Sequence, residues 1–298
     1  MLSRRYLLAL IASLPAACVR PGSGASLVST YDPAREASIY PEGPPFVAVF
    51  AKGKTKLGWV AAVHTPAPQS PTADTIALAF AAVRPRAVVL EGFPTRWGAN
   101  PDRILRRLSR LPEDQGDEGD VAARAALASG ADIWGGEPTD AELAAALAGE
   151  GYAADDIFYT ALLGPLEQDQ RNGVFSTVQG PEFEESFLSI AAAMAPSYAV
   201  DAPSGPEGFR NWFNARFGVP LEDDPEWFTR GWPGKTGIGA EISRASNRLR
   251  DVHAYTVATD RVRTHGRVVV VYGGSHLSSV WGALEHDFGP PHLQRPPH

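Results

Sequence analysis

The run Arg267-Val-Val-Val-Val-Tyr272 constrains the fold most strongly. A short, apolar, β-branched segment flanked by glycine-containing turns is typical of a strand buried on both faces of a parallel sheet. Arg86 to Leu90 is a second such segment, and the sequences Pro71 to Ala82 and Pro101 to Leu111 on either side of it have helical patterns. This alternation indicates βαβ units. It predicts an α/β fold with a mixed, mainly parallel central sheet flanked by helices.

The remaining elements complete a single α/β domain over residues 46–289. The segments 46–50 and 57–63 predict a hairpin that opens the sheet, and residues 131–134 a further short strand. Residues 153–238 predict a helical and aromatic-loop insertion. Its dense aromatic residues between 210 and 234 favour local packing, with a substrate-binding lid as the alternative. The proline-rich residues 290–298 predict a disordered tail.

Four of the predicted strands run into titratable side chains, namely His64, Glu91, Glu137 and His276. Parallel strands place their carboxyl ends along one edge of the sheet, where ligands usually bind, so these distant residues are expected to share one site. Two imidazoles and one or two carboxylates are suitable ligands for a divalent metal that activates water. We therefore predict His64, Glu91 and His276 as metal ligands and Glu137 as a catalytic residue.

Two further features add candidates to this site. Gly273, Gly274 and Ser275 lead into a predicted helix, whose amide groups suit an oxyanion, and are predicted to bind substrate. Arg250 lies beside Asp251 on the helix predicted over residues 241–263. It is predicted to stabilise a substrate carboxylate or a developing oxyanion, with a surface ion pair as the alternative. The sequence has no Gly-x-Ser-x-Gly elbow and no Walker or dinucleotide glycine fingerprint.

Charge and the N-terminus limit the partners and the location. The 27 basic and 34 acidic residues give a net charge of -7, which disfavours nucleic acid as a partner. Residues 1–18 combine a charged start, a short apolar run and a small-residue end, which predicts an export signal. Leu14 to Cys18 is similar to a lipobox, and Ser3 to Leu8 to a twin-arginine signal. Lipidation at Cys18, followed by a flexible tether over 19–45, predicts a periplasmic lipoprotein whose only membrane contact is its lipid.

The spacing of these motifs resembles the TraB/GumN/Tiki family, related to the erythromycin esterase-like and ChaN-like proteins. The matching segments are Ala61-Ala-Val-His64, Pro85 to Glu91, Arg250-Asp251 and Gly273-Gly-Ser-His276. They span roughly residues 47–288, with Ala61 where the family usually has glycine. The resemblance implies hydrolysis. In Tiki-like members the motif histidines are thought to bind a metal, whereas esterase-like relatives hydrolyse without a required metal.

Together these observations predict a periplasmic hydrolase in which a divalent ion, manganese, cobalt or zinc, assists cleavage of a peptide or small ester bond. One alternative is a metal-independent esterase-like hydrolase with a histidine as general base and Arg250 at the oxyanion. Another is a non-catalytic binding lipoprotein that holds its ligand with the aromatic loops. The sequence does not determine the substrate or the oligomeric state.

Overall fold

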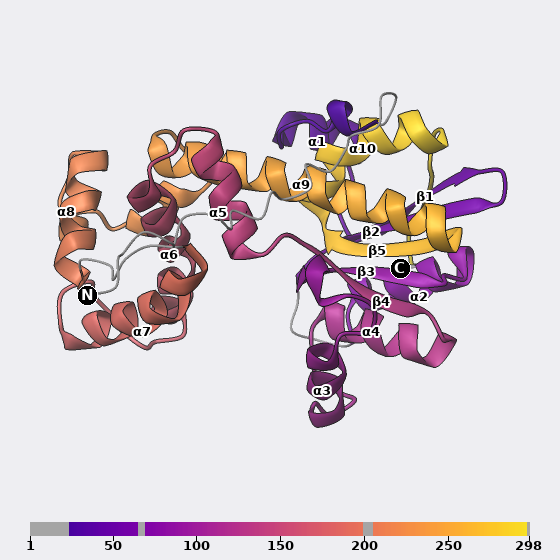
Figure 1. The fold of residues 1–298 in the computed structure, drawn as a ribbon, viewed down its shortest axis with the longest axis horizontal. Helices are drawn as coiled ribbons and strands as arrows, with labels where there is room; N and C mark the ends of the chain where they lie inside the picture. The colour runs from indigo at the N-terminus through magenta and orange to yellow at the C-terminus, as the bar shows by residue number, and fades with distance from the viewer. Residues whose placement is uncertain (1–23, 65–68, 199–204, 297–298) are drawn as a thin grey trace, which may run out of the picture.

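The computed structural model describes residues 24–64, 69–198 and 205–296, which form a mixed, mainly parallel α/β structure (Figure 1). Their six-stranded sheet has the order β4-β3-β5-β2-β1-β6. The neighbours β4, β3, β5 and β2 are parallel, and β1 pairs antiparallel with both β2 and β6. The bounds are β1 (Phe46–Lys52), β2 (Thr55–Ala62), β3 (Ala87–Pro94), β4 (Asp132–Glu137), β5 (Arg267–Gly273) and β6 (His292–Gln294). The α/β class predicted from the sequence is confirmed.

Helices cover both faces of the sheet. Helices α2 (Pro71–Val83) and α4 (Glu118–Ser129) pack on one face, and α9 (Ile238–His265) and α10 (Gly274–Phe288) on the other. Side chains along β5 alternate between the two layers, since Val269 packs with the α2 side and Val270 with the α9 side. This explains the uninterrupted valine run, because both faces of the strand are buried.

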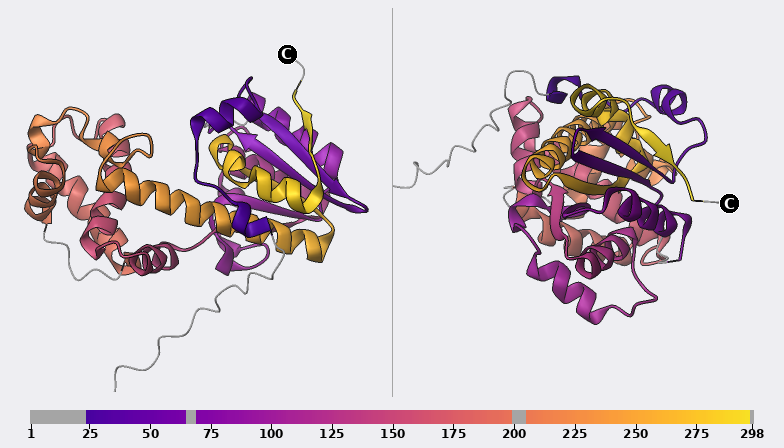
Figure 2. Two further views of the ribbon diagram at one scale, coloured as in Figure 1. Left: turned by 90° about the horizontal axis from the view of Figure 1, so that it is seen from above. Right: turned by 90° about the vertical axis from the view of Figure 1, so that its right-hand side faces the viewer.

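A second, helical lobe lies beside the sheet (Figure 1). It consists of α5 (Asp140–Gly149), α6 (Ala154–Arg171), α7 (Pro181–Tyr198), α8 (Gly205–Phe217) and the 3₁₀ turns η3 (Leu221–Asp223) and η4 (Trp227–Gly231). Figure 2 shows α9 running from this lobe onto the sheet. The described residues between 154 and 231 form helices and turns, and the lobe also includes α5, which lies before the predicted start of the insertion at residue 153. Trp212, Phe213 and Trp227 are buried in the core of this lobe, which agrees with local packing for the aromatic residues.

Two segments near the ends of the chain differ from the predictions. In the described part of the predicted tether, η1 (Gly24–Leu27) and α1 (Pro33–Ile39) pack against α10, and the Ser29 amide donates to the Ser279 carbonyl. In the predicted disordered tail, β6 pairs with the outer edge of β1. Both segments are ordered by contacts with residues far away in the chain, which local composition does not encode. Cys18 and the predicted export signal lie outside the described residues.

Two short elements follow β3 and lead to α4. They are η2 (Thr95–Trp97) and α3 (Asp102–Arg110). No helix among the described residues is both long and apolar enough to cross a membrane.

Gly135 is required where β3 shifts register against β4. A Cβ at this position would lie 2.1 Å from the carbonyl oxygen of Phe93, which is backbone and cannot rotate away. Gly135→Ala is therefore expected to lower the free energy of unfolding by about 1–3 kcal/mol, the usual effect of overpacking. Urea denaturation measures this change. The control is Gly149→Ala, since Gly149 is the exposed last residue of α5 with open space around it, and this change should leave stability unchanged or slightly higher. Equal stability of the two variants would contradict the prediction.

Candidate functional site

The parallel strands bring the four predicted strand-end residues to one edge of the sheet. His64 lies two residues beyond β2, and Glu91 lies within β3. Glu137 ends β4, and His276 lies in the first turn of α10, directly after β5. Because β4, β3, β5 and β2 are adjacent and parallel, these residues converge as the sequence predicts.

Glu91 is at the centre of the site. Its Oε2 accepts a hydrogen bond from the Gly273 amide at 2.6 Å and lies 3.8 Å from Nε2 of His64. Its Oε1 lies 3.4 Å from Nε2 of His276 and 3.2 Å from Nη2 of Arg250. Burial by itself would raise the pKa of Glu91, but the hydrogen bond and charge of His276, the charge of Arg250 and the Gly273 amide lower it to about 2. Glu91 is therefore ionised at neutral pH.

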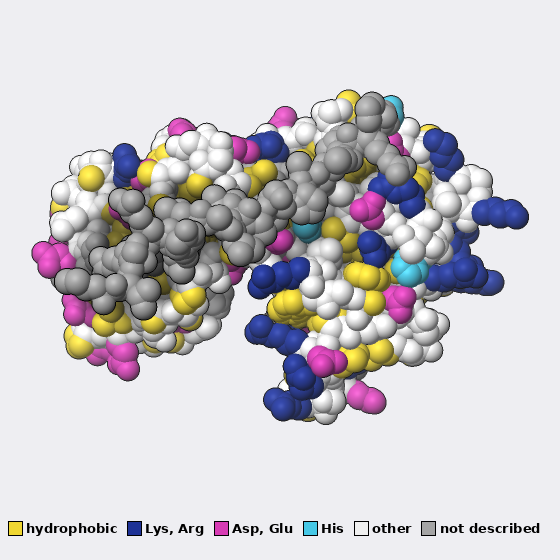
Figure 3. All heavy atoms as spheres, viewed as in Figure 1, with side chains coloured by type: hydrophobic (Ala, Val, Ile, Leu, Met, Phe, Trp, Pro, Cys, Tyr) yellow, Lys and Arg dark blue, Asp and Glu magenta, His cyan; other side chains and the backbone are white. Residues whose placement is uncertain are grey.

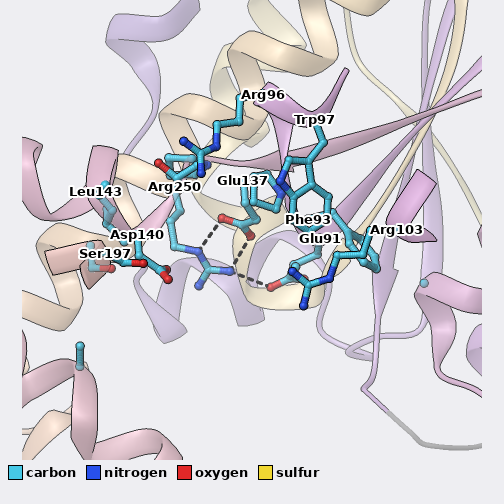
Figure 4. A pocket seen from close by; sticks show the side chains of 18 of the residues that line it. Glu91, Phe93, Arg96, Trp97, Arg103, Glu137, Asp140, Leu143, Ser197 and Arg250 are labelled. Atoms are coloured by element: carbon cyan, nitrogen blue, oxygen red, sulfur yellow. Dashed lines mark hydrogen bonds and ion pairs between the residues drawn. The ribbon is translucent and has the colours of Figure 1, made fainter. Parts of the chain in front are cut away.

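Arg250 reaches the site from α9 and is held by two carboxylates (Figure 4). Its Nε and Nη2 donate to the two oxygens of Glu137 at 2.8 and 2.6 Å, a bidentate pair, and Nη2 also donates to Glu91. This geometry fixes the plane of the guanidinium. Nη1 makes no hydrogen bond to the described residues, and Arg250 lines the cavity described below. The predicted catalytic residue Glu137 thus positions Arg250.

His64 forms a dyad with Glu118, which lies in the first turn of α4. Nδ1 of His64 contacts Oε1 of Glu118, and this hydrogen bond raises the pKa of His64. The side chain of His64 is 61% exposed, and its Nε2 makes no hydrogen bond to the described residues. A carboxylate at Nδ1 fixes the orientation and tautomer of the ring, which leaves Nε2 available as a base.

His276 forms a second, buried pair. Its Nδ1 lies 2.5 Å from Oδ1 of Asp251, on the same helix as Arg250. His253, the other titratable residue of that helical segment, turns elsewhere, because its Nε2 contacts Oγ1 of Thr95 at 2.9 Å. Burial lowers the pKa of His253. It is therefore neutral and takes part in packing between α9 and η2.

The three residues predicted to bind substrate, Gly273, Gly274 and Ser275, lie in different surroundings. Gly273 borders the site, since a Cβ there would lie 2.8 Å from Nε2 of His64. Gly274 is packed against Pro44, and its carbonyl accepts from the Tyr40 hydroxyl at 2.9 Å. Ser275 lines a smaller cavity of about 260 Å³ together with Asp251 and His276.

A cavity of about 1070 Å³ opens at these residues, between the sheet and the helical lobe (Figure 4). Its size suits a drug-sized ligand or a short peptide. Residues of the sheet lobe include His64, Glu91 and Arg250, and Ser197 and Tyr198 of α7 contribute from the helical lobe. The aromatic residues between 210 and 234 do not line it. The described structure therefore places the candidate chemistry, and not the aromatic loops, in the large cavity.

The donor groups do not fit a resident metal ion as they are arranged. Both oxygens of Glu91 are already used, one by the Gly273 amide and one by the cationic Arg250. A divalent ion between Glu91 and the two imidazoles would lie close to that guanidinium, which repels it. Within the described ranges, no group of three or more His, Cys, Asp or Glu side chains is arranged to hold a metal. The metal ion remains a prediction.

Two contributors were missed from the sequence. Glu118 carries no local signal beyond a position near a helix start, which favours an acid for reasons of helix stability alone. Asp251 was noticed only as a neighbour of Arg250. Both act through contacts with residues 54 and 25 positions away in the chain, so only tertiary structure reveals them.

Because His276 pairs with Asp251, we expect the free energy of unfolding to depend on pH. Burial by itself would lower the pKa of His276, but its hydrogen bonds with Asp251 and Glu91 and their charges raise it to about 9 from 6.5. The stabilisation is therefore complete below pH 6.5 and is lost as the pH rises through about 9. The free energy of unfolding should fall by on the order of 3 kcal/mol across this interval.

Urea denaturation at several pH values measures this fall. His276→Gln should remove it, whereas His286→Gln should preserve it, because His286 is exposed and, among the described residues, forms an ion pair only with its neighbour Asp287. A wild-type free energy of unfolding that stays constant from pH 6.5 to 10 would contradict the prediction.

Comparisons with protein-family models, with curated proteins and with solved structures find no match to this chain.

Proposed function

We propose that this protein is a hydrolase that cleaves an ester or amide bond with water activated by His64. The observation that carries the proposal is the His64–Glu118 dyad, because Nε2 of His64 makes no hydrogen bond to the described residues and His64 lines the large cavity together with Arg250. A general base needs a fixed ring, a free nitrogen and space for water and substrate. The motifs that resemble TraB/GumN/Tiki proteins supply His64 and Arg250, which agrees with hydrolysis.

In the proposed reaction, Nε2 of His64 takes a proton from water as the oxygen attacks the substrate carbonyl carbon. The electron pair of the carbonyl moves onto its oxygen, and Nη1 of Arg250 donates a hydrogen bond to the resulting oxyanion. When the oxyanion collapses, the bond to the alcohol or amine breaks and His64 returns the proton to the leaving group. The products are an acid and an alcohol or amine, so water is the only co-reactant.

The surrounding carboxylates hold these two groups in place. Glu118 keeps the His64 ring oriented and stabilises its protonated form during the reaction. Glu137 and Glu91 fix the plane of Arg250, and the buried charge of His276 stabilises Glu91. Pre-organised donors of this kind need little rearrangement when the oxyanion forms.

The test is hydrolysis of a panel of 4-nitrophenyl esters and anilide peptides by the full chain, before and after exhaustive chelation. Turnover that survives chelation is expected. Turnover that is lost on chelation and restored by manganese, cobalt or zinc would favour metal-assisted hydrolysis instead. Two imidazole nitrogens lie within 3.8 Å of Glu91, but Arg250 and the Gly273 amide would have to release the oxygens of Glu91 before an ion could bind there. Hydrolysis of no member of the panel would count against both.

We also propose that the protein is exported and lipid-anchored in the periplasm, on the strength of residues 1–18 alone. Metabolic labelling with radioactive palmitate is expected to mark the wild type and not Cys18→Ser. Labelling of both proteins, or of neither, would remove the lipid anchor from the proposal.

A further inference from the structure

One wall of the large cavity carries two arginines that form no ion pair with the described residues, although the charge of Arg96 contributes to lowering the pKa of Glu142. Arg96 and Trp97 belong to η2, and Arg103 to α3, and all three line the cavity (Figure 4). Neither arginine forms an ion pair with the described residues. The guanidinium of Arg103 lies over the Trp97 ring, 5.2 Å from its centre, a contact that orients the cation.

The other charges in the cavity are largely neutralised by one another. Glu91 and Glu137 pair with Arg250, and Glu118 pairs with His64. Arg107 of α3, which also lines the cavity, pairs with Asp117. One further acid, Asp140, lies on the helical lobe in the first turn of α5, where the helix dipole stabilises it. Two cations therefore remain on the sheet side of the cavity.

This arrangement is unusual for an acidic chain. The protein has a net charge of -7, yet basic side chains line the edge of the sheet lobe that faces the hollow between the lobes (Figure 3). Unpaired arginines add nothing to the stability of the fold through ion pairs. Their planar donor groups match carboxylate and phosphate oxygens.

We propose that Arg96 and Arg103, with Trp97, bind an anionic group of the substrate, a carboxylate or a phosphate, at a distance from the bond that is cleaved. The substrate class is then an anionic ester or amide, such as a peptide with a free carboxylate. The indole of Trp97 contributes an apolar surface and an N–H donor beside the guanidinium of Arg103. The preference for an anionic substrate rests on the hydrolytic function proposed above. Anion binding at Arg96 and Arg103 does not depend on that function.

Binding is tested first, with probes that need no turnover. Isothermal titration calorimetry of the full chain with succinate, inorganic phosphate and neutral succinamide should show binding of at least one anion and none of succinamide. Arg96→Gln/Arg103→Gln should weaken anion binding by about 10-fold or more, because two charge-assisted contacts are lost. Arg106→Gln/Arg110→Gln is the matched control, since both residues are exposed on α3 and do not line the cavity.

Turnover is tested second, with 4-nitrophenyl hydrogen succinate against its neutral methyl ester. The anionic ester should have the lower KM in the wild type, and the Arg96→Gln/Arg103→Gln variant should raise the KM of the anionic ester to that of the neutral one. Anion binding without any hydrolysis would support the anion site and count against the proposed function. Anion binding that is equal in both double variants, or absent from the wild type, would overturn the anion site whatever the hydrolytic activity. Preference for phosphate over succinate would identify a phosphorylated substrate within the same class.

Discussion

His64→Ala is expected to lower kcat by about 10²–10⁴-fold, the usual contribution of a general base. The variant should fold normally, because the His64 side chain is 61% exposed and contributes little packing. The measurement is steady-state hydrolysis of the best ester found in the substrate panel, with circular dichroism to verify folding. His286→Ala is the control, since its side chain is 54% exposed and belongs to α10.

Two further experiments test whether His64 acts by proton transfer. As His64 acts in its neutral form, kcat should rise with pH through a pKa above 6.5, because the Glu118 hydrogen bond raises that pKa. Glu118→Gln weakens this effect and should move the rise to lower pH. A His64→Ala enzyme with wild-type kcat, or a profile unmoved by Glu118→Gln, would exclude His64 as the base.

Arg250→Met is expected to cost about 3–5 kcal/mol of the free energy of unfolding at pH 7, as is usual when one partner of a buried ion pair is removed. The variant leaves Glu91 and Glu137 without their shared cation, and the side chain of Glu137 is only 9% exposed. Urea denaturation measures the loss. Arg248→Met, two residues earlier on α9, removes a more exposed pair with Glu150 and should cost less than about 1 kcal/mol.

A double variant separates charge from packing in this prediction. Arg250→Met/Glu137→Gln should regain part of the stability lost in Arg250→Met, because it removes the charge of Glu137, which Arg250→Met leaves without a cation, whereas Glu91 keeps His276. Equal stability of the single and double variants would mean that Arg250 contributes mainly through contact. Activity should remain low in both, since neither variant offers Nη1 to an oxyanion.

The sheet and the convergence of the predicted site could be inferred from the sequence because both depend on local patterns. A valine-rich strand buried on both faces and helices between successive strands imply a parallel sheet, and a parallel sheet places its carboxyl ends together. His64, Glu91, Glu137 and His276 were therefore found without any knowledge of their contacts. The buried aromatic residues of the helical lobe were also anticipated, since dense apolar side chains need a core.

The roles of these residues could not be inferred, because charge pairing depends on distances in space. Arg250 belongs to a helix more than 100 positions from Glu137, and their bidentate contact changes Glu137 from a catalytic candidate into a positioning residue. The same contact, with the Gly273 amide, occupies both oxygens of Glu91 that were expected to bind a metal. The spacing of Arg103 along its helix indicates by itself no more than a solvated helix face. Only the helical lobe opposite makes that face one wall of a cavity.

The sequence by itself determined the α/β class, the strand ends and the residue types at the site, since hydrophobic periodicity and strand direction are encoded over a few residues. Tertiary structure alone decided which charges neutralise one another and which remain free. Tertiary structure alone also decided that η1 and α1 pack on α10 and that β6 pairs with β1. Electrostatic pairing and edge-strand pairing act between segments that lie far apart in the chain but a few ångströms apart in space, as β1 and β6 do, and no local pattern specifies such partners.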